Sequence, residues 1–122
     1  SSKSSSNELD LDASNLHTTL RNWATSPNNC VAVQKALKKA SAKQISKVFQ
    51  ILEPAIVELS SHAFGNHCVQ TLLRMCTTQH LFRLLPRLFG TNVVKLACDE
   101  YSNHVLQTFL HVADSTLLTK AV

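Results

Sequence analysis

The sequence predicts an all-α fold, an α-α superhelix (solenoid) of about three units with three short helices each. Apolar residues recur at helical spacing in short stretches from Leu16 onward, and brief polar or glycine-containing turns separate these stretches. The whole pattern repeats with a period of about 36 residues, which is typical of a helical solenoid. Tetratricopeptide and ankyrin repeats have similar periods, but they contain two helices per unit.

The first unit is expected over residues 16–52. Its first helix carries Trp23, which we expect to close the first hydrophobic layer, and a turn at residues 26–29 ends that helix. The second helix runs to about Ala40, and Ser41 opens the third helix.

The second and third units are expected over residues 53–89 and 90–122, and the third is cut short in its last helix. Pro54 fits the first turn of a helix. The segment before the repeats, residues 1–15, is Ser-rich and then acidic, which predicts a flexible leader. Breaks between the remaining helices are expected at Gly65, Thr77–Thr78, Gly90–Thr91, Ser102 and Asp114–Ser115.

Composition excludes several classes of protein. An apolar fraction of 44% is enough for a packed core, and two glycines and three prolines argue against an all-β fold. No stretch approaches the roughly 18–20 apolar residues that a membrane span needs, and the start lacks the pattern of a signal sequence. Beyond the first twelve residues the chain holds 11 basic against 5 acidic residues, an excess that attracts polyanions.

Cysteine and histidine spacing gives no sign of a metal site or a redox motif. The four cysteines form no C-x-x-C pair and lie in apolar helical patterns, which predicts buried, reduced thiols. The six histidines are scattered. The sequence also lacks a Ser/His/Asp constellation, a paired-carboxylate site and a phosphate-binding glycine loop, so we expect no enzymatic activity, no cofactor and no metal.

The repeated motif is the main functional signal. Residues 64–73 and 101–110 share the pattern Asn-His-x-x-Gln-Thr, and the first unit keeps its Gln while Val31 replaces the ring. The Asn, the His and the Gln of each copy share one helix face, because residues three and four apart are neighbours on a helix. Stacked units would align them along one surface. We call the following residues the amide row: Cys30, Gln34, Asn66, His67, Gln70, Asn103, His104 and Gln107.

The chemistry of the amide row suits an unpaired base. Two amides one turn apart offer donors and acceptors to the Watson–Crick edge of a base. An imidazole between them can stack on base faces, and such stacking is worth about 1–3 kcal/mol per base. The amide row therefore predicts binding of single-stranded RNA.

Residues 52–70 and 89–107 resemble repeats of the Pumilio (PUF) family. Each has an aromatic-Gly or aromatic-Ser turn, a polar residue, a ring, two apolar residues and Gln. The resemblance implies one base per repeat, with Asn and Gln reading uracil, Cys and Gln reading adenine, and RNA running antiparallel to the protein. The implied core is 5′-UUA-3′, read in that order by Asn103 with Gln107, Asn66 with Gln70, and Cys30 with Gln34.

The resemblance also implies a wider role. It implies control of messenger RNA through 3′ untranslated regions, with protein partners on the convex face, in the cytoplasm.

Leu117, Leu118 and Val122 begin an unfinished helix, which predicts further repeats or self-association through the open C-terminal repeat. The candidate phosphate contacts are Lys35, Lys38 and Arg74, which could equally be solvated, and the histidines that fall outside the amide row, expected at the surface, are His62, His80 and His111.

Two alternatives stay open from the sequence. The chain could be a divergent, nucleolar PUF-like protein that binds structured or ribosomal RNA through charge, with a steep dependence on salt. It could also be an armadillo-like scaffold that binds a peptide in the same groove.

Overall fold

The computed structural model describes the backbone of residues 9–121 and the side chains of residues 9–115. This part of the chain is helical and contains no strand. The elements are α1 (Leu16–Ala24), α2 (Cys30–Lys39), α3 (Ala42–Leu52), the 3-10 turn η2 (Glu53–Ala55), α4 (Ile56–Ser60), α5 (Gly65–Met75), α6 (Thr78–Phe89), α7 (Val93–Cys98) and α8 (Ser102–Ala121).

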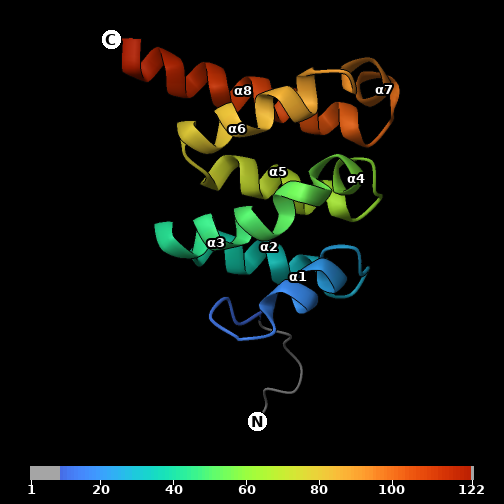
Figure 1. Ribbon diagram of the computed structural model, residues 1–122, viewed down its shortest axis with the longest axis vertical. Coiled ribbons are helices and arrows are strands. Elements are labelled where there is room, and N and C mark those ends of the chain that lie inside the picture. Colours follow the sequence, from blue (N-terminus) through green and yellow to red (C-terminus); the bar gives the residue numbers. More distant parts are fainter. Residues whose placement is uncertain (1–8, 122) are drawn as a thin grey trace.

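The helices form three units stacked along the long axis of the molecule (Figure 1). Helices α1 to α3 make the first unit, η2 to α6 the second, and α7 with α8 the third. The second helix of each unit packs on that of the next, α2 on α5 and α5 on α8. The predicted all-α superhelix is therefore confirmed.

Hydrogen-bonded caps explain why the chain breaks after α2 and after α5. Ser41 and Thr77 have extended backbone conformations and accept hydrogen bonds from the backbone N–H three residues on. The residues at that third position, Gln44 and His80, bond back to the cap in both cases. Such a reciprocal pair satisfies two of the donors that a helix N-terminus leaves open.

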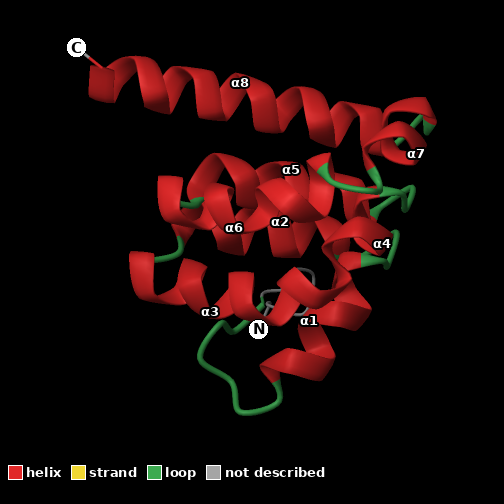
Figure 2. Cartoon of the chain, turned by 45° about the horizontal axis from the view of Figure 1, so that its top comes forward, coloured by secondary structure: helices red, strands yellow, loops and turns green. Residues whose placement is uncertain are grey.

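The expected break at Asp114–Ser115 is wrong, because α8 continues through it as one helix of 20 residues (Figure 2). Asp114 matches Ser41 and Thr77 in the repeat, but the third residue after it is Leu117, which cannot complete a capping box. The side chains of residues 116–122 lie outside the described ones, so the self-association expected from them stays a prediction.

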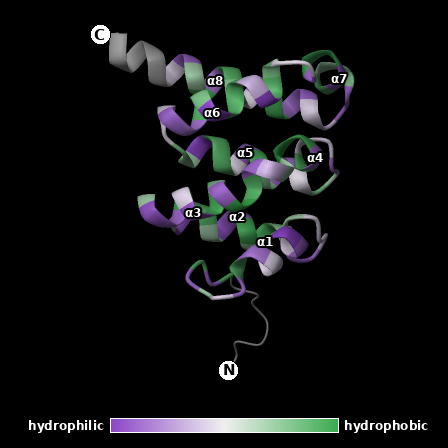
Figure 3. Ribbon diagram, viewed as in Figure 1, coloured by the Kyte–Doolittle hydropathy of each residue, from purple (hydrophilic) through white to green (hydrophobic). Residues whose placement is uncertain are grey.

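One continuous core joins the three units. Apolar residues lie on the inner faces of the stacked helices (Figure 3). Trp23 is half-buried against the core, as expected. Leu11 is also buried in it, at 5% exposure, and Gln44 donates a hydrogen bond to Asp12. Part of the segment expected as a leader thus packs on the first unit, because its leucines cover the open end of the core.

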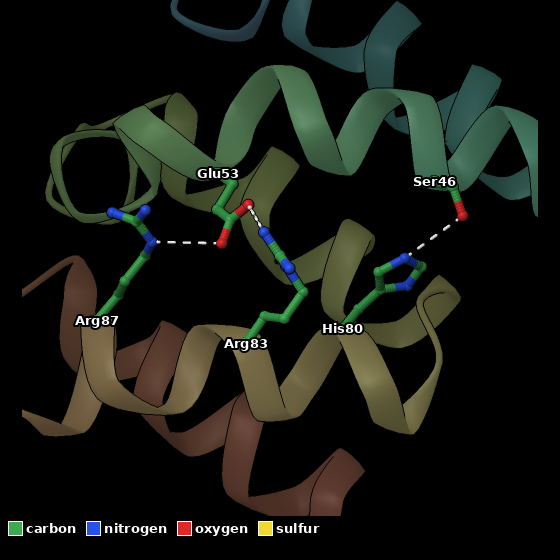
Figure 4. Close-up of polar contacts among 5 residues, drawn as sticks. All are labelled: Ser46, Glu53, His80, Arg83 and Arg87. Carbon is green, nitrogen blue, oxygen red and sulfur yellow. Dashed lines mark hydrogen bonds and ion pairs between the residues drawn. The ribbon is translucent and has the colours of Figure 1, made fainter.

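A polar contact set surrounds α6, the outer helix of the second unit, and reaches α3 of the first unit through His80 (Figure 4). Glu53 accepts a hydrogen bond from Arg83 at 3.0 Å and pairs with Arg87 at 3.4 Å. His80 lies 3.4 Å from the Ser46 hydroxyl, and its ring stacks on Phe49 with centroids 4.4 Å apart. Burial, and then the nearby Arg83, lower the pKa of His80, which Glu53 opposes. His80 is therefore a half-buried packing residue and not the surface residue expected from the sequence.

No helix in the described part of the chain is both long enough and apolar enough to span a membrane.

Candidate nucleic-acid interface

Helices α2, α5 and α8 bring most of the amide row together on one surface. Gln34 and Gln70 are half-buried and Gln107 is exposed, at equivalent positions of three adjacent helices. The matching ring positions are exposed in all three units, and they are held by Val31, His67 and His104. The predicted alignment of polar and ring side chains therefore exists in the structure, with an aliphatic residue in place of the first ring.

Asn66 differs from the rest of the amide row because it is only 2% exposed. Its Nδ2 donates to the backbone carbonyls of His62, at 2.8 Å, and Ala63, at 2.9 Å. Its Oδ1 accepts from Gln70 Nε2 at 2.9 Å. Both of its N–H donors are used, and little of its surface is left for a base.

Asn103 and Gln107 make the same amide-to-amide bond in a more open setting. Gln107 Nε2 donates to Asn103 Oδ1 at 2.9 Å. Asn103 is half-buried and Gln107 is exposed. A base approaching the third unit can therefore reach both side chains.

Cys30 lies in the hydrophobic core and not on the open surface. It is 6% exposed, and its Sγ is 4.0 Å from the carbonyl of Pro27. Cys68, the following core thiol, donates to the Cys30 carbonyl at 3.6 Å. The predicted adenine contact of the first unit therefore depends mainly on Gln34, which stays accessible.

A second row of side chains runs parallel to the amide row. Lys38, Arg74 and His111 each follow the Gln of their unit by one helical turn, and all three are exposed. His111 had been placed outside the predicted interface. Its offset from Arg74, the same as that between the repeated Gln residues, is the signal that could have found it. We call the two basic side chains among them, Lys38 and Arg74, the cationic row. Lys35 is exposed on α2 as well.

Each helix of the interface begins at a capped turn. Ser26 Oγ accepts from Asn29 N at 3.4 Å at the start of α2. His62 Nδ1 accepts from the N–H groups of Phe64 and Gly65 at 3.0 and 3.1 Å before α5. His62 is thus a half-buried cap, unlike the surface residue expected from the sequence.

The matching cap of α8 is a carboxylate. Asp99 Oδ1 accepts from the N–H groups of Ser102 and Tyr101, at 3.1 and 2.8 Å. These bonds, that from Ser102 first, lower the pKa of Asp99, because they stabilise its charged form. Three different side chains therefore fix the same turn in the three units.

The aromatic-Gly and aromatic-Ser turns of the motif have a shared structural cause. A Cβ atom at Gly65 would lie 2.8 Å from the carbonyl oxygen of Leu59. At the equivalent place in the third unit, Ser102 is fully buried and donates to the carbonyl of Leu96 at 2.7 Å. The residue at this position must therefore either lack a side chain, as Gly65 does, or carry one that donates a hydrogen bond to that carbonyl, as Ser102 does.

The thiols are free, but they are not all buried as expected. Burial, and secondarily the nearby Cys30, raise the pKa of Cys68 to about 12, and burial raises that of Cys76 to about 12. Cys98, on α7, is exposed. Among the described residues, no group of His, Cys, Asp and Glu could hold a metal ion.

Comparison with known proteins agrees with this geometry. The sequence matches the Pumilio-family RNA binding repeat over residues 30–52, 55–86 and 92–118. It is 28% identical over 83 residues to Pumilio homology domain family member 4 of Saccharomyces cerevisiae, and 24% identical over 99 residues to a Pumilio domain-containing protein of Schizosaccharomyces pombe. These matches cover 66% and 81% of the chain, which spans only 9% and 14% of the two curated relatives.

Two solved structures share the fold. The Puf3 RNA binding domain bound to a Cox17 RNA 3′ UTR recognition sequence superposes with a TM-score of 0.78 at 19% identity, over 90% of this chain and 31% of that one. PUF-8 in complex with PBE-RNA superposes with a TM-score of 0.71 at 23% identity, over 83% of this chain and 28% of that one.

Proposed function

Because the chain belongs to the Pumilio family of RNA binding repeats, we propose that it binds single-stranded RNA along the surface of α2, α5 and α8, about one base per unit. The observation that carries the proposal is the alignment of Gln34, Gln70 and Gln107 beside exposed stacking positions on adjacent helices. Stacking supplies affinity for any base, and the amides supply choice among bases. The expected core is 5′-UUA-3′. The membership in a repeat family, and not an enzyme family, fits the expectation of a binding protein, and it separates the chain from armadillo-like scaffolds.

The third unit offers the sharpest test, since both of its amides are accessible. The double variant N103S/Q107E should switch the preferred base at that position from uracil to guanine. A carboxylate accepts from N1–H and N2–H₂ of guanine, whereas uracil would present the acceptor O4 to it. The mismatch should cost about 1–3 kcal/mol, or roughly 5- to 150-fold in affinity.

The measurement is a fluorescence titration against four RNAs that differ only at that base. As a matched control, H104A should weaken binding to all four RNAs about equally, because stacking tolerates every base. Uniform weakening in N103S/Q107E, without reversal of rank between uracil and guanine, would contradict base reading at this unit.

A second candidate function is charge-driven binding of structured or ribosomal RNA with little base preference. The exposed cationic row, the buried Cys30 and the missing first ring favour it. Under this alternative, unrelated RNAs compete equally. Removing Lys38 and Arg74 together should then lower the slope of log affinity against log salt by about 0.7–0.9 per lost phosphate contact, the range from single strands to duplexes.

We extend the proposal to the whole protein as control of messenger RNA through 3′ untranslated regions in the cytoplasm, with protein partners on the convex face. Its support is the family and the similarity to a domain whose structure contains a 3′ UTR sequence. Crosslinking of the protein to RNA in cells tests it. Crosslinks concentrated in 3′ untranslated regions support the extension, whereas crosslinks concentrated in ribosomal RNA with nucleolar staining favour the second candidate.

A further inference from the structure

The Gln70 side chain is held at both ends, and one of the two partners comes from the next unit. Its Nε2 donates to Asn66 Oδ1 at 2.9 Å, within α5. Its Oε1 accepts from the Thr108 hydroxyl of α8 at 3.2 Å. Thr108 is buried, at 8% exposure, and belongs to no predicted part of the interface.

The direction of these hydrogen bonds is set by backbone groups that can only accept. The carbonyl oxygens of His62 and Ala63 can only accept, so the nitrogen of Asn66 must face them. Asn66 therefore presents its amide oxygen to Gln70, and Gln70 must donate to it from its amide nitrogen. The oxygen of Gln70 is left facing Thr108, whose hydroxyl donates to it.

This network leaves Gln70 with one free N–H and one free lone pair, in a fixed order. This order matters because uracil and cytosine differ in the order of donor and acceptor along their pairing edges. Uracil offers the acceptor O4 beside the donor N3–H, whereas cytosine offers the donor N4–H₂ beside the acceptor N3. An amide locked in one orientation fits only one of these patterns, and a flipped amide fits the other.

The Asn66 bond fixes which end of the Gln70 amide is nitrogen, and we propose that Thr108, from the neighbouring unit, is a specificity-determining positioning residue that keeps this amide from rotating away, so that the second unit distinguishes uracil from cytosine. The inference rests on the proposed function and deepens it. Asn66, nearly buried, also acts through Gln70 and not on the base. The second unit thus reads its base with one amide that two partners orient.

The neighbouring units lack this arrangement. The residue that matches Thr108 in the second unit is Thr71, which donates to its own helix, to the His67 carbonyl at 3.1 Å. In the third unit, no hydroxyl among the described side chains donates to Gln107 Oε1. Within residues 9–115, Gln70 is therefore the one repeated glutamine whose amide is hydrogen-bonded to a side chain of another unit.

The variant T108V removes the hydroxyl and keeps the shape, and T71V is its matched control. The 122-residue chain would be titrated with short RNAs that carry 5′-UUA-3′, 5′-UCA-3′ or 5′-CUA-3′. In T108V the preference for UUA over UCA should fall about 2- to 12-fold, the range for loss of one hydrogen bond. Its preference for UUA over CUA should not change, because that base faces the third unit.

Both T71V and T108S, which keeps the hydroxyl, should retain the wild-type preference. If T108V prefers UUA over UCA as strongly as the wild type does, the inference is wrong while the base-reading proposal stands. The same conclusion follows if T71V loses as much of this preference as T108V. If the wild type binds all three RNAs equally, the base-reading proposal fails and the inference with it.

A second readout needs no RNA. The ¹⁵N–¹H signals of the Gln70 side-chain amide should move in T108V and stay in place in T71V and T108S. Unmoved Gln70 signals in T108V would overturn the inference, even for a variant with altered binding.

Discussion

Leu73 and Leu110 occupy the same position in the second and third units, yet Leu73 is fully buried and Leu110 is 56% exposed. Phe49 and Leu85 form a similar pair in the outer helices of the first and second units, with 1% and 42% exposure. Leu73 lies on α5, on which α8 packs, and Phe49 contacts His80 of α6. In the described chain, no further second helix follows α8 to cover Leu110, and no further outer helix follows α6 to cover Leu85.

The comparison shows that burial in this fold belongs to a position in the stack and not to a residue type. Each unit buries only the apolar face that its neighbour covers, as expected for a quasi-one-dimensional repeat protein. The same rule applies at the interface: Gln70 is hydrogen-bonded by the unit that follows it, whereas no unit follows Gln107 among the described residues. The predictions below compare the enclosed second unit with the open third unit.

The largest difference is expected in thiol reactivity. At neutral pH, a pKa of about 12 in place of 9.0 lowers the thiolate fraction of Cys68 and Cys76 about a thousandfold. Cys98, on α7, is exposed to reagent. Titration of the native protein with a thiol reagent should therefore show one fast thiol, absent in C98S, and denaturation should release all four. Rapid reaction of Cys68 in the native protein would contradict the enclosed second unit.

The next difference concerns stability. L73A should lower the free energy of unfolding by about 2–5 kcal/mol, because it leaves a cavity between α5 and α8. The matched change L110A should cost less than about 0.5 kcal/mol, as exposed substitutions usually do. Urea unfolding followed by circular dichroism measures both. Similar costs for the two variants would mean that Leu110 is covered in solution.

The sequence is sufficient for most of the fold because its signals are local. Capping residues such as Ser41 and Thr77, and the spacing of apolar residues, determine where helices begin and which face is buried. The one wrong break, at Asp114–Ser115, had a plausible cap but no capping-box partner. A cap residue alone was insufficient to end a helix.

The candidate site was predicted less completely because it depends on distant contacts. Repetition identified which positions share a face, and the structure places Gln34, Gln70 and Gln107 there. Repetition could not show that Asn66 is closed off by backbone carbonyls, or that Thr108 reaches Gln70 across 38 residues of sequence. Such bonds depend on how two units dock, which a single-unit pattern does not contain.

A smaller effect is expected within the second unit, where η2 contacts α6. Glu53 pairs with both Arg83 and Arg87, whose side chains are 63% and 45% exposed. Removing either arginine should cost less than about 1 kcal/mol, since solvent screens these charges and the other arginine stays. The double variant R83A/R87A should cost about 1–3 kcal/mol, more than the sum of the single variants, because the nearly buried carboxylate then loses both partners.

The contact between α6 and the third unit includes an apolar pair. Phe89 of α6 packs on Phe109 of α8 with ring centroids 5.2 Å apart. Raising the salt concentration should therefore reduce the difference between wild type and R83A/R87A, and it should leave the cost of F89A unchanged. If the costs of the two single variants add up to the cost of the double variant, then neither arginine compensates for the loss of the other at Glu53.

The smallest effect is expected at the carboxylate cap of the third unit. Because folding lowers the pKa of Asp99 below its ordinary value of 3.8, its contribution to stability is complete above about pH 4 and is lost as the pH falls through the folded value. Hydrogen exchange of the Tyr101 and Ser102 amides, which donate to this carboxylate, should therefore accelerate relative to the rest of α8 as the solution is acidified below pH 4, after correction for intrinsic rates. D99N is the matched control, since its side-chain oxygen can still accept both bonds but does not titrate, and its two amides should show no such acid-dependent loss. An equal loss of protection in D99N would mean that acid acts elsewhere and that the Asp99 carboxylate does not control the start of α8.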